Sequence, residues 1–152
     1  MFSTTASEHP LIQSYLETHY HVGGASPFVL QIDIVCDSLK ELYRQSNADC
    51  CAYVTACNPF SHPVDDATNA DRQAALVREL KARSLSFIEG VGQHPSGNWP
   101  GEPSYLVLGL SLEVAKALGR KYEQNAIVWC GPDAVPKLWT GCFGVWSQQS
   151  LG

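Results

Sequence analysis

Residues 51–56, with the sequence CAYVTA, decide the fold, because a continuous apolar run of this length is typical of a buried β-strand. Residues 66–83 follow, and their apolar side chains recur at the spacing of one helical face. The same signals predict, in order, a strand at residues 85–91, a strand at 104–110, a helix capped by Ser111 and a strand at 126–130.

The resulting order, β-α-β-β-α-β, is typical of the ferredoxin-like fold, in which an antiparallel sheet carries both helices on one face. We therefore predict the α+β class, with a ferredoxin-like core over about residues 50–131.

An N-terminal α-β-α extension is predicted at about residues 8–46. Apolar residues at helical spacing indicate a helix at residues 10–20, and alternating residues at 28–35 indicate a strand that extends the sheet at an edge. Ser38 and Glu41 match a capping box and predict a further helix.

The last segment, residues 138–152, is an apolar tail that contains Trp139, Phe143 and Trp146. Two interpretations stay open: an extra strand, or a tail that packs on the body or on a second copy of the chain. With 152 residues, 45% of them hydrophobic, we expect residues 1–152 to form a single domain.

The net charge, the hydropathy and the cysteine content indicate where the protein is located and which partners it can bind. The net charge of −5 argues against nucleic acid as a partner, because such binding depends on neutralising phosphates. No secretory signal and no apolar run of membrane-spanning length is visible, so we expect a cytoplasmic protein without a membrane partner. The six cysteines are then expected to be reduced thiols.

Three polar clusters lie beside the predicted strands: NPFS at residues 58–61, WPGEPS at 99–104 and QN at 124–125. The predicted topology brings all three to one rim of the sheet, next to the start of the helix at residue 66. The candidate ligand-binding residues there are Asn58, Ser61, Asn69, Arg72, Trp99, Glu102, Ser104, Gln124 and Asn125.

Glu102 and Arg72 are the candidate catalytic residues. Glu102 stands between glycine and prolines on a stiff loop near the predicted core, and a partly buried carboxylate needs a partner. Arg72 is the expected partner, either in a structural ion pair or as the group that stabilises charge beside a catalytic acid. Structural roles also suit the other residues: Asn58 fits a turn and Asp65 an ordinary N-cap.

Cys57, His62 and His94 are weak candidates for a metal site at the same rim. Zinc sites usually contain close ligand pairs such as CxxC or HExxH, and the sequence has neither. GxSxG, GxxxxGK[ST] and GxGxxG are absent too. We predict no metal and no cofactor.

The motifs TACNPFS at residues 55–61, NWPGEPS at 98–104 and QNAIV at 124–128 resemble those of a family of short bacterial proteins known only as a domain of unknown function. The resemblance extends from residue 15 to 138 and implies no activity. An aromatic residue is commoner in that family at the position of Cys57, which argues against a shared cysteine-based chemistry.

Three functions fit these observations. The first is a binding or regulatory module that holds a small polar ligand or a peptide at the rim, because amides, a guanidinium and an aromatic face suit hydrogen bonding and stacking. The second is a hydrolase or transferase that uses Glu102 as general acid or base. The third is an interaction protein that self-associates as a homo-oligomer and whose rim is structural. The first is preferred because the sequence shows no nucleophile–base pair.

Overall fold

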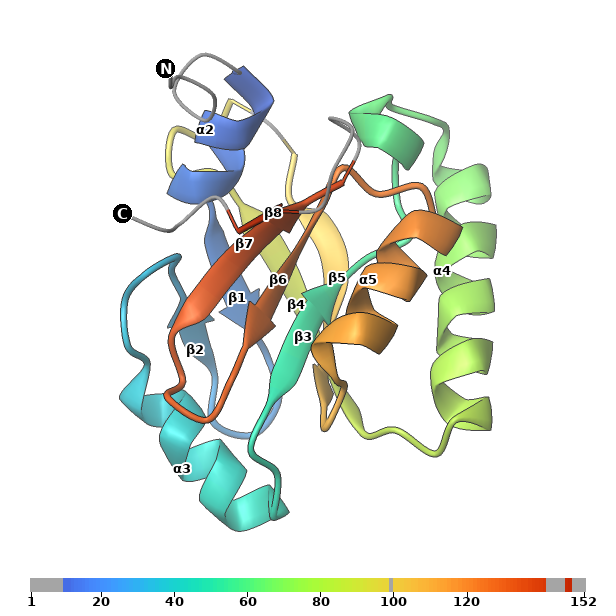
Figure 1. The fold of residues 1–152 in the computed structure, drawn as a ribbon. Coiled ribbons are helices and arrows are strands. Elements are labelled where there is room, and N and C mark those ends of the chain that lie inside the picture. Colours follow the sequence, from blue (N-terminus) through green and yellow to red (C-terminus); the bar gives the residue numbers. More distant parts are fainter. Residues whose placement is uncertain (1–9, 99, 142–146, 149–152) are drawn as a thin grey trace.

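The computed structural model describes residues 10–98, 100–141 and 147–148 (Figure 1). Its helices are α2 (Pro10–Glu17), α3 (Asp37–Ser46), α4 (Asp66–Ala82) and α5 (Leu112–Lys121), with a short 3₁₀ turn, η1 (Pro59–Ser61). Its strands are β1 (His19–Val22), β2 (Phe28–Leu30), β3 (Cys51–Val54), β4 (Phe87–Gln93), β5 (Glu102–Leu108), β6 (Ala126–Cys130), β7 (Pro136–Thr140) and β8 (Ser147–Gln148).

All strands pair antiparallel in one sheet with the order β2-β1-β4-β5-β3-β6-β7-β8. The predicted α+β class is confirmed, and the predicted order of strands and helices occurs from β3 to β6. β6 has the predicted bounds, whereas β4 and β5 each begin two residues away from the expected start. None of the helices within the described ranges has both the length and the apolar character needed to cross a bilayer.

Each face of the sheet has its own apolar core. Helices α4 and α5 cover one face of the sheet (Figure 1). Leu76, Leu118 and Val54 of β3 belong to one cluster of buried side chains there. Helices α2 and α3 border the opposite face, where Ile12 and Leu39 belong to a second cluster of buried side chains. Alternation along the strands assigns successive residues to opposite faces, so neighbouring strand residues enter different cores.

The N-terminal region differs from the prediction. The first helix ends at Glu17 instead of residue 20, because residues 19–22 form β1, which joins the sheet between β2 and β4. β2 does lie at the sheet edge but ends at Leu30, since Asp33 turns the chain with a φ of 69°. The expected capping box is also wrong: Cys36 is the N-cap of α3 and contributes no side-chain hydrogen bond.

The tail begins as a strand. Trp139 lies in β7, which pairs with β6, and β8 pairs with β7 in turn, so the extra-strand interpretation holds for these residues. Phe143 and Trp146 lie outside the described residues. Of the cysteines, the five in the described ranges are free thiols, and Cys142 lies outside them.

Tyr53 connects the central strand to the N-terminal strand. Its hydroxyl donates a hydrogen bond to the carbonyl of His21 across 2.7 Å. This hydrogen bond passes so close to β4 that position 90 must be glycine. A Cβ at position 90 would lie 2.2 Å from the His21 carbonyl oxygen and 2.7 Å from the Tyr53 hydroxyl. The close approach of β1 to β4 therefore depends on Gly90.

We expect Gly90→Ala to lower the free energy of unfolding by about 1–3 kcal/mol, because the added methyl group must push β1 or Tyr53 aside. Gly92→Ala is the matched control on the same strand, since its Cβ would make only ordinary contacts at 3.8 Å. Urea unfolding of both variants measures the difference. Equal stability of the two variants would contradict this assignment.

Glu79 joins the two helices on one face of the sheet. Its Oε1 lies 2.7 Å from the ammonium of Lys121 and accepts a hydrogen bond from the Tyr122 hydroxyl at 2.8 Å, while Oε2 lies 3.1 Å from Arg83. The hydrogen bond from Lys121 makes the largest contribution to lowering the pKa of Glu79 to about 2, and burial opposes it.

This lowered pKa predicts acid-sensitive packing of α4 against α5. A carboxyl group with a lowered folded-state pKa adds stability above its ordinary pKa of 4.5, and that stability is lost as the pH falls toward 2. We expect Glu79→Gln to cost about 1 kcal/mol at pH 7 and clearly less at pH 2, where much of the ionised form has been protonated. Unfolding curves at both pH values, with the 83% exposed Glu113 changed to Gln as the control, measure this. A cost that does not change with pH would contradict it.

Candidate functional site

Asn58 is the centre of the rim. Its backbone N–H donates to Asn69 Oδ1 at 2.8 Å, and its own Oδ1 accepts from Asn69 Nδ2 at 2.9 Å and from the backbone N–H of Val64 at 3.2 Å. Its Nδ2 donates to Glu102 Oε2 at 3.0 Å. One amide side chain thus joins the loop after β3 to helix α4 and to the start of β5.

The loop that Asn58 anchors has an unusual backbone. Asn58, Phe60 and Ser61 have φ values of 50°, 51° and 63°, in the left-handed region that residues with a Cβ rarely occupy. The side chain of Phe60 is 46% exposed. Such conformations cost free energy and persist where surrounding contacts enforce them, as they often do at functional sites.

Arg72 contributes to those contacts and does not pair with Glu102. Its Nε donates to the carbonyl of Ala56 at 2.6 Å and its Nη2 to the carbonyl of Tyr122 at 2.6 Å, while Nη1 lies 3.3 Å from Glu123. The expected Arg72–Glu102 ion pair is therefore wrong. The guanidinium instead donates to two backbone carbonyls, and a sequence pattern cannot predict such partners.

Glu102 is left with one hydrogen bond to its carboxylate. Oε2 accepts from Asn58, whereas Oε1 accepts no hydrogen bond within the described part of the chain and still contacts solvent. Burial raises the pKa of Glu102, and the hydrogen bond from Asn58 offsets part of that rise. Burial also raises the pKa values of Tyr20 and Tyr53, and the nearby Glu102 carboxylate adds to both.

The third cluster reaches the same loop. Gln124 Nε2 donates to the carbonyls of Cys57 and Tyr122, both at 3.0 Å. Asn125, which is 3% exposed, donates through Nδ2 to Ser61 Oγ at 2.7 Å, and Ser61 Oγ lies 2.6 Å from the Tyr15 hydroxyl. The three clusters meet as expected, and their amides bind the loop itself.

Two residues of this network were missed by sequence reasoning. Gln73 Oε1 accepts from the backbone N–H of Ala56 at 2.7 Å, and Gln73 Nε2 donates to the carbonyl of Pro103 at 3.1 Å. Tyr15 reaches the rim from α2. A glutamine one position after Arg72, on the same helix, was the available signal for the first; no sequence signal links Tyr15 to residue 61.

The remaining candidates are Ser104, Trp99 and the three weak metal candidates. Ser104 is 4% exposed and its hydroxyl donates to the carbonyl of Glu102, so it supports the backbone. Trp99 lies outside the described residues. Burial raises the pKa of the Cys57 thiol, and His62 is exposed. Across the described ranges, no three His, Cys, Asp or Glu side chains gather as a metal site.

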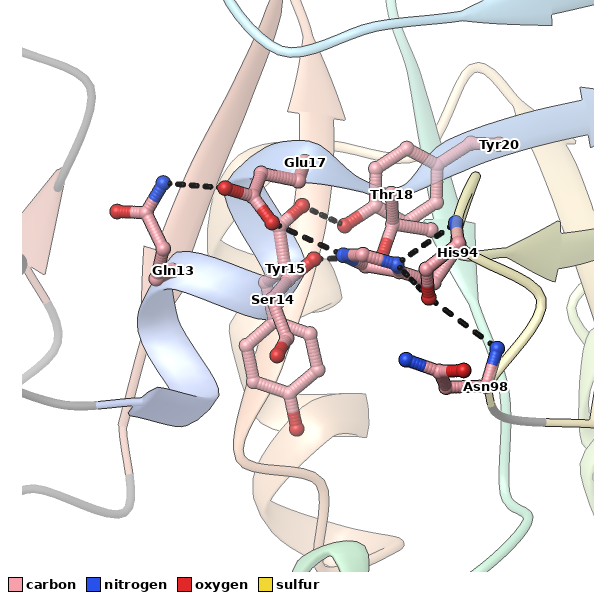
Figure 2. A network of polar contacts seen from close by, with 9 residues as sticks. Gln13, Ser14, Tyr15, Glu17, Thr18, Tyr20, His94 and Asn98 are labelled. Carbon is pink, nitrogen blue, oxygen red and sulfur yellow. Dashed lines mark hydrogen bonds and ion pairs between the residues drawn. The ribbon is translucent and has the colours of Figure 1, made fainter.

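His94 takes part in a second network, which Figure 2 shows from close by. Its Nε2 lies 2.9 Å from Glu17 Oε1 on helix α2, and its Nδ1 lies 2.8 Å from the hydroxyl of Ser96. Gln13 Nε2 donates to the other Glu17 oxygen at 2.8 Å. Sequence reasoning missed this arrangement because Glu17 and His94 are 77 positions apart.

No curated protein and no solved structure matches the chain. The resemblance predicted from the motifs is confirmed for the part of the chain that contains most of the rim, although the match is shorter than the 15–138 expected. Residues 54–127 match the family model described as "Protein of unknown function (DUF3293)".

Proposed function

We propose that this chain is a binding module whose rim holds a small polar ligand, or a peptide end, through an N–H or ammonium group that binds Glu102. The observation that carries this proposal is the half-satisfied carboxylate: Oε2 is held by Asn58 and Oε1 has no partner within the described ranges. A charged acceptor that is screened from bulk water binds a donor more strongly than an exposed one does.

The surrounding amide side chains do not contact the ligand in this proposal but hold the Glu102 carboxylate in place. Asn58, Asn69, Gln73 and Gln124 are all engaged with the loop or with each other, so they fix the position of the carboxylate. Preorganised sites of this kind avoid the cost of ordering side chains when a ligand arrives. The exposed ring of Phe60 supplies an apolar surface on the same loop.

We also propose that the segment from β3 to β6 is a ferredoxin-like unit within a single domain. The adjacent order β4-β5-β3-β6 and the packing of α4 and α5 on one face support this topology. β1 and β2 would then extend the unit at one edge and β7 and β8 at the other.

A second candidate function is general acid–base catalysis by Glu102 in a hydrolase or transferase. The raised pKa of Glu102 favours it, because a carboxyl group that stays protonated closer to neutral pH can donate a proton. The carbonyl contacts of Arg72 weigh against its expected role at the reacting centre.

The proposal predicts that amine ligands stabilise the protein through Glu102. We expect at least one member of a panel of the twenty amino acids, glycylglycine, putrescine and spermidine to raise the melting temperature, since binding to the folded state stabilises it. Glu102→Gln should weaken that binding at least about tenfold, because it removes the charge but keeps the shape. Isothermal titration gives the affinity.

Two further variants make this experiment decisive. Glu113→Gln removes an exposed carboxylate elsewhere and should bind normally. Asn58→Gly keeps the positive φ accessible but removes the amide that orients Glu102, and should bind more weakly. Equal binding by the wild type and Glu102→Gln, or no response to the whole panel, would refute the proposal.

The raised pKa of Glu102 predicts a stability cost at neutral pH. A carboxyl group with a raised folded-state pKa contributes most stability below its ordinary pKa of 4.5, and this contribution is lost as the pH rises through the folded-state value. We expect Glu102→Gln to be more stable than the wild type by on the order of 1 kcal/mol at pH 7.5, and the gain to disappear at pH 4. Urea unfolding at both pH values tests this; a less stable variant at pH 7.5 would contradict it.

A further inference from the structure

Glu17, His94 and Ser96 form a hydrogen-bonded line that is separate from the hydrogen bonds around Asn58 at the rim. His94 lies in it between a carboxylate and a hydroxyl, with Nε2 2.9 Å from Glu17 Oε1 and Nδ1 2.8 Å from Ser96 Oγ. The His94 side chain is 14% exposed, whereas Ser96 is exposed. A shielded imidazole next to an accessible hydroxyl is the arrangement that nucleophilic catalysis requires.

The hydrogen bonds fix which nitrogen of His94 carries the proton. The backbone N–H of Ser96 donates to Nδ1 at 3.2 Å, so Nδ1 is the acceptor. Nε2 then carries the hydrogen and donates it to Glu17. The backbone N–H and the hydroxyl of Ser96 share the lone pair of Nδ1, which can accept the hydroxyl proton, and the Glu17 carboxylate is placed to stabilise the imidazolium that this transfer creates.

The local backbone makes this placement rigid. Residues 94–97 form a turn closed by a 3.0 Å hydrogen bond from the N–H of Gly97 to the carbonyl of His94. Pro95 restricts the second position of the turn, and the φ of 73° at Gly97 lies in the region that favours glycine. The N–H of Asn98 donates to Ser96 Oγ at 3.1 Å and orients the hydroxyl further.

Helix α2 completes the line from the other side. Gln13 Nε2 donates to the second oxygen of Glu17, one helical turn earlier, and holds the carboxylate toward His94 (Figure 2). The hydrogen bond from Gln13 makes the largest contribution to lowering the pKa of Glu17, and the one from His94 comes next, so this group is charged at neutral pH.

We propose that Ser96, His94 and Glu17 form a nucleophilic triad that transfers the acyl group of a small carboxylic ester to Ser96. Ser96 Oγ attacks the ester carbonyl carbon while its proton moves to His94 Nδ1, and Glu17 stabilises the charged imidazole through Nε2–H. The bond from the carbonyl carbon to the alcohol oxygen breaks, and the alcohol leaves with the proton from Nδ1.

Water completes the cycle. It attacks the acyl carbon, gives a proton to Nδ1, and the bond to Ser96 Oγ breaks as that proton returns to the serine. The reaction consumes one ester and one water and releases one acid and one alcohol, with no other reactant. Asn98, two residues after Ser96, has an exposed side chain whose amide is a hydrogen-bond donor of the kind that stabilises an oxyanion.

The test uses the full chain, a fluorophosphonate probe and p-nitrophenyl acetate. We expect the probe to add covalently to the peptide that contains Ser96, and ester hydrolysis to exceed the buffer rate. Ser96→Ala should abolish both. His94→Gln should slow both by on the order of 10²–10⁴-fold, the usual contribution of a positioned base, and Glu17→Gln should slow hydrolysis while the protein stays folded.

Matched controls separate chemistry from folding. Ser46→Ala removes an exposed serine on α3 and His62→Gln an exposed histidine, and both should react like the wild type. Melting temperatures of all variants check the fold. The proposal is overturned if the wild type is not labelled, if labelling survives Ser96→Ala, or if His94→Gln reacts at the wild-type rate.

Discussion

The rim of this protein depends on the amide side chain of Asn58. Its three hydrogen bonds, together with the one that the Asn58 backbone N–H donates, tie a backbone in the left-handed region to helix α4 on one side and to Glu102 at the start of β5 on the other. These bonds help to offset the cost of the positive φ values at Asn58, Phe60 and Ser61. The loop, the helix start and the carboxylate therefore form one structural unit.

This structural unit holds the Glu102 carboxylate in a partly buried place, where its charge lowers the stability of the fold. Burial raises the pKa of Glu102, so its charged form destabilises the folded chain at neutral pH, whereas Glu79 on the opposite face is surrounded by cations and contributes stability. Arg72, the counter-ion expected from the sequence, binds main-chain carbonyls instead. A charged group retained at a cost to stability is the usual mark of a functional position.

The sequence predicted the parts of this structure that rest on strong local periodicity. α4 and β6 have long or continuous apolar patterns, and their bounds agree with the structure to within a residue. β1 was hidden because its four residues, HYHV, continue the helical spacing of Leu16, and only pairing with β4 makes them a strand. Short strands are fixed by their neighbours rather than by their own residues.

The site was predictable in position but not in its bonding. Strand and helix directions suffice to bring Asn58, Glu102 and Gln124 to one rim, which the hydrogen bonds confirm. The partner of Arg72 and the line from Glu17 to Ser96 depend on side-chain reach across elements far apart in sequence, and no period or motif encodes that. The nucleophile–base pair that the sequence seemed to lack becomes visible only in three dimensions.

The most direct measurement of the central claim is the titration of the Glu102 carboxyl group itself. Carbon-13 NMR of protein labelled at the glutamate side-chain carboxyl carbons, with the Glu102 signal assigned by its loss in Glu102→Gln, gives the pKa without reference to any ligand. We expect a midpoint above the ordinary 4.5, as burial with one amide partner requires. A midpoint at or below 4.5 would mean that the carboxylate is solvated or paired with a cation, and would contradict the rim described above.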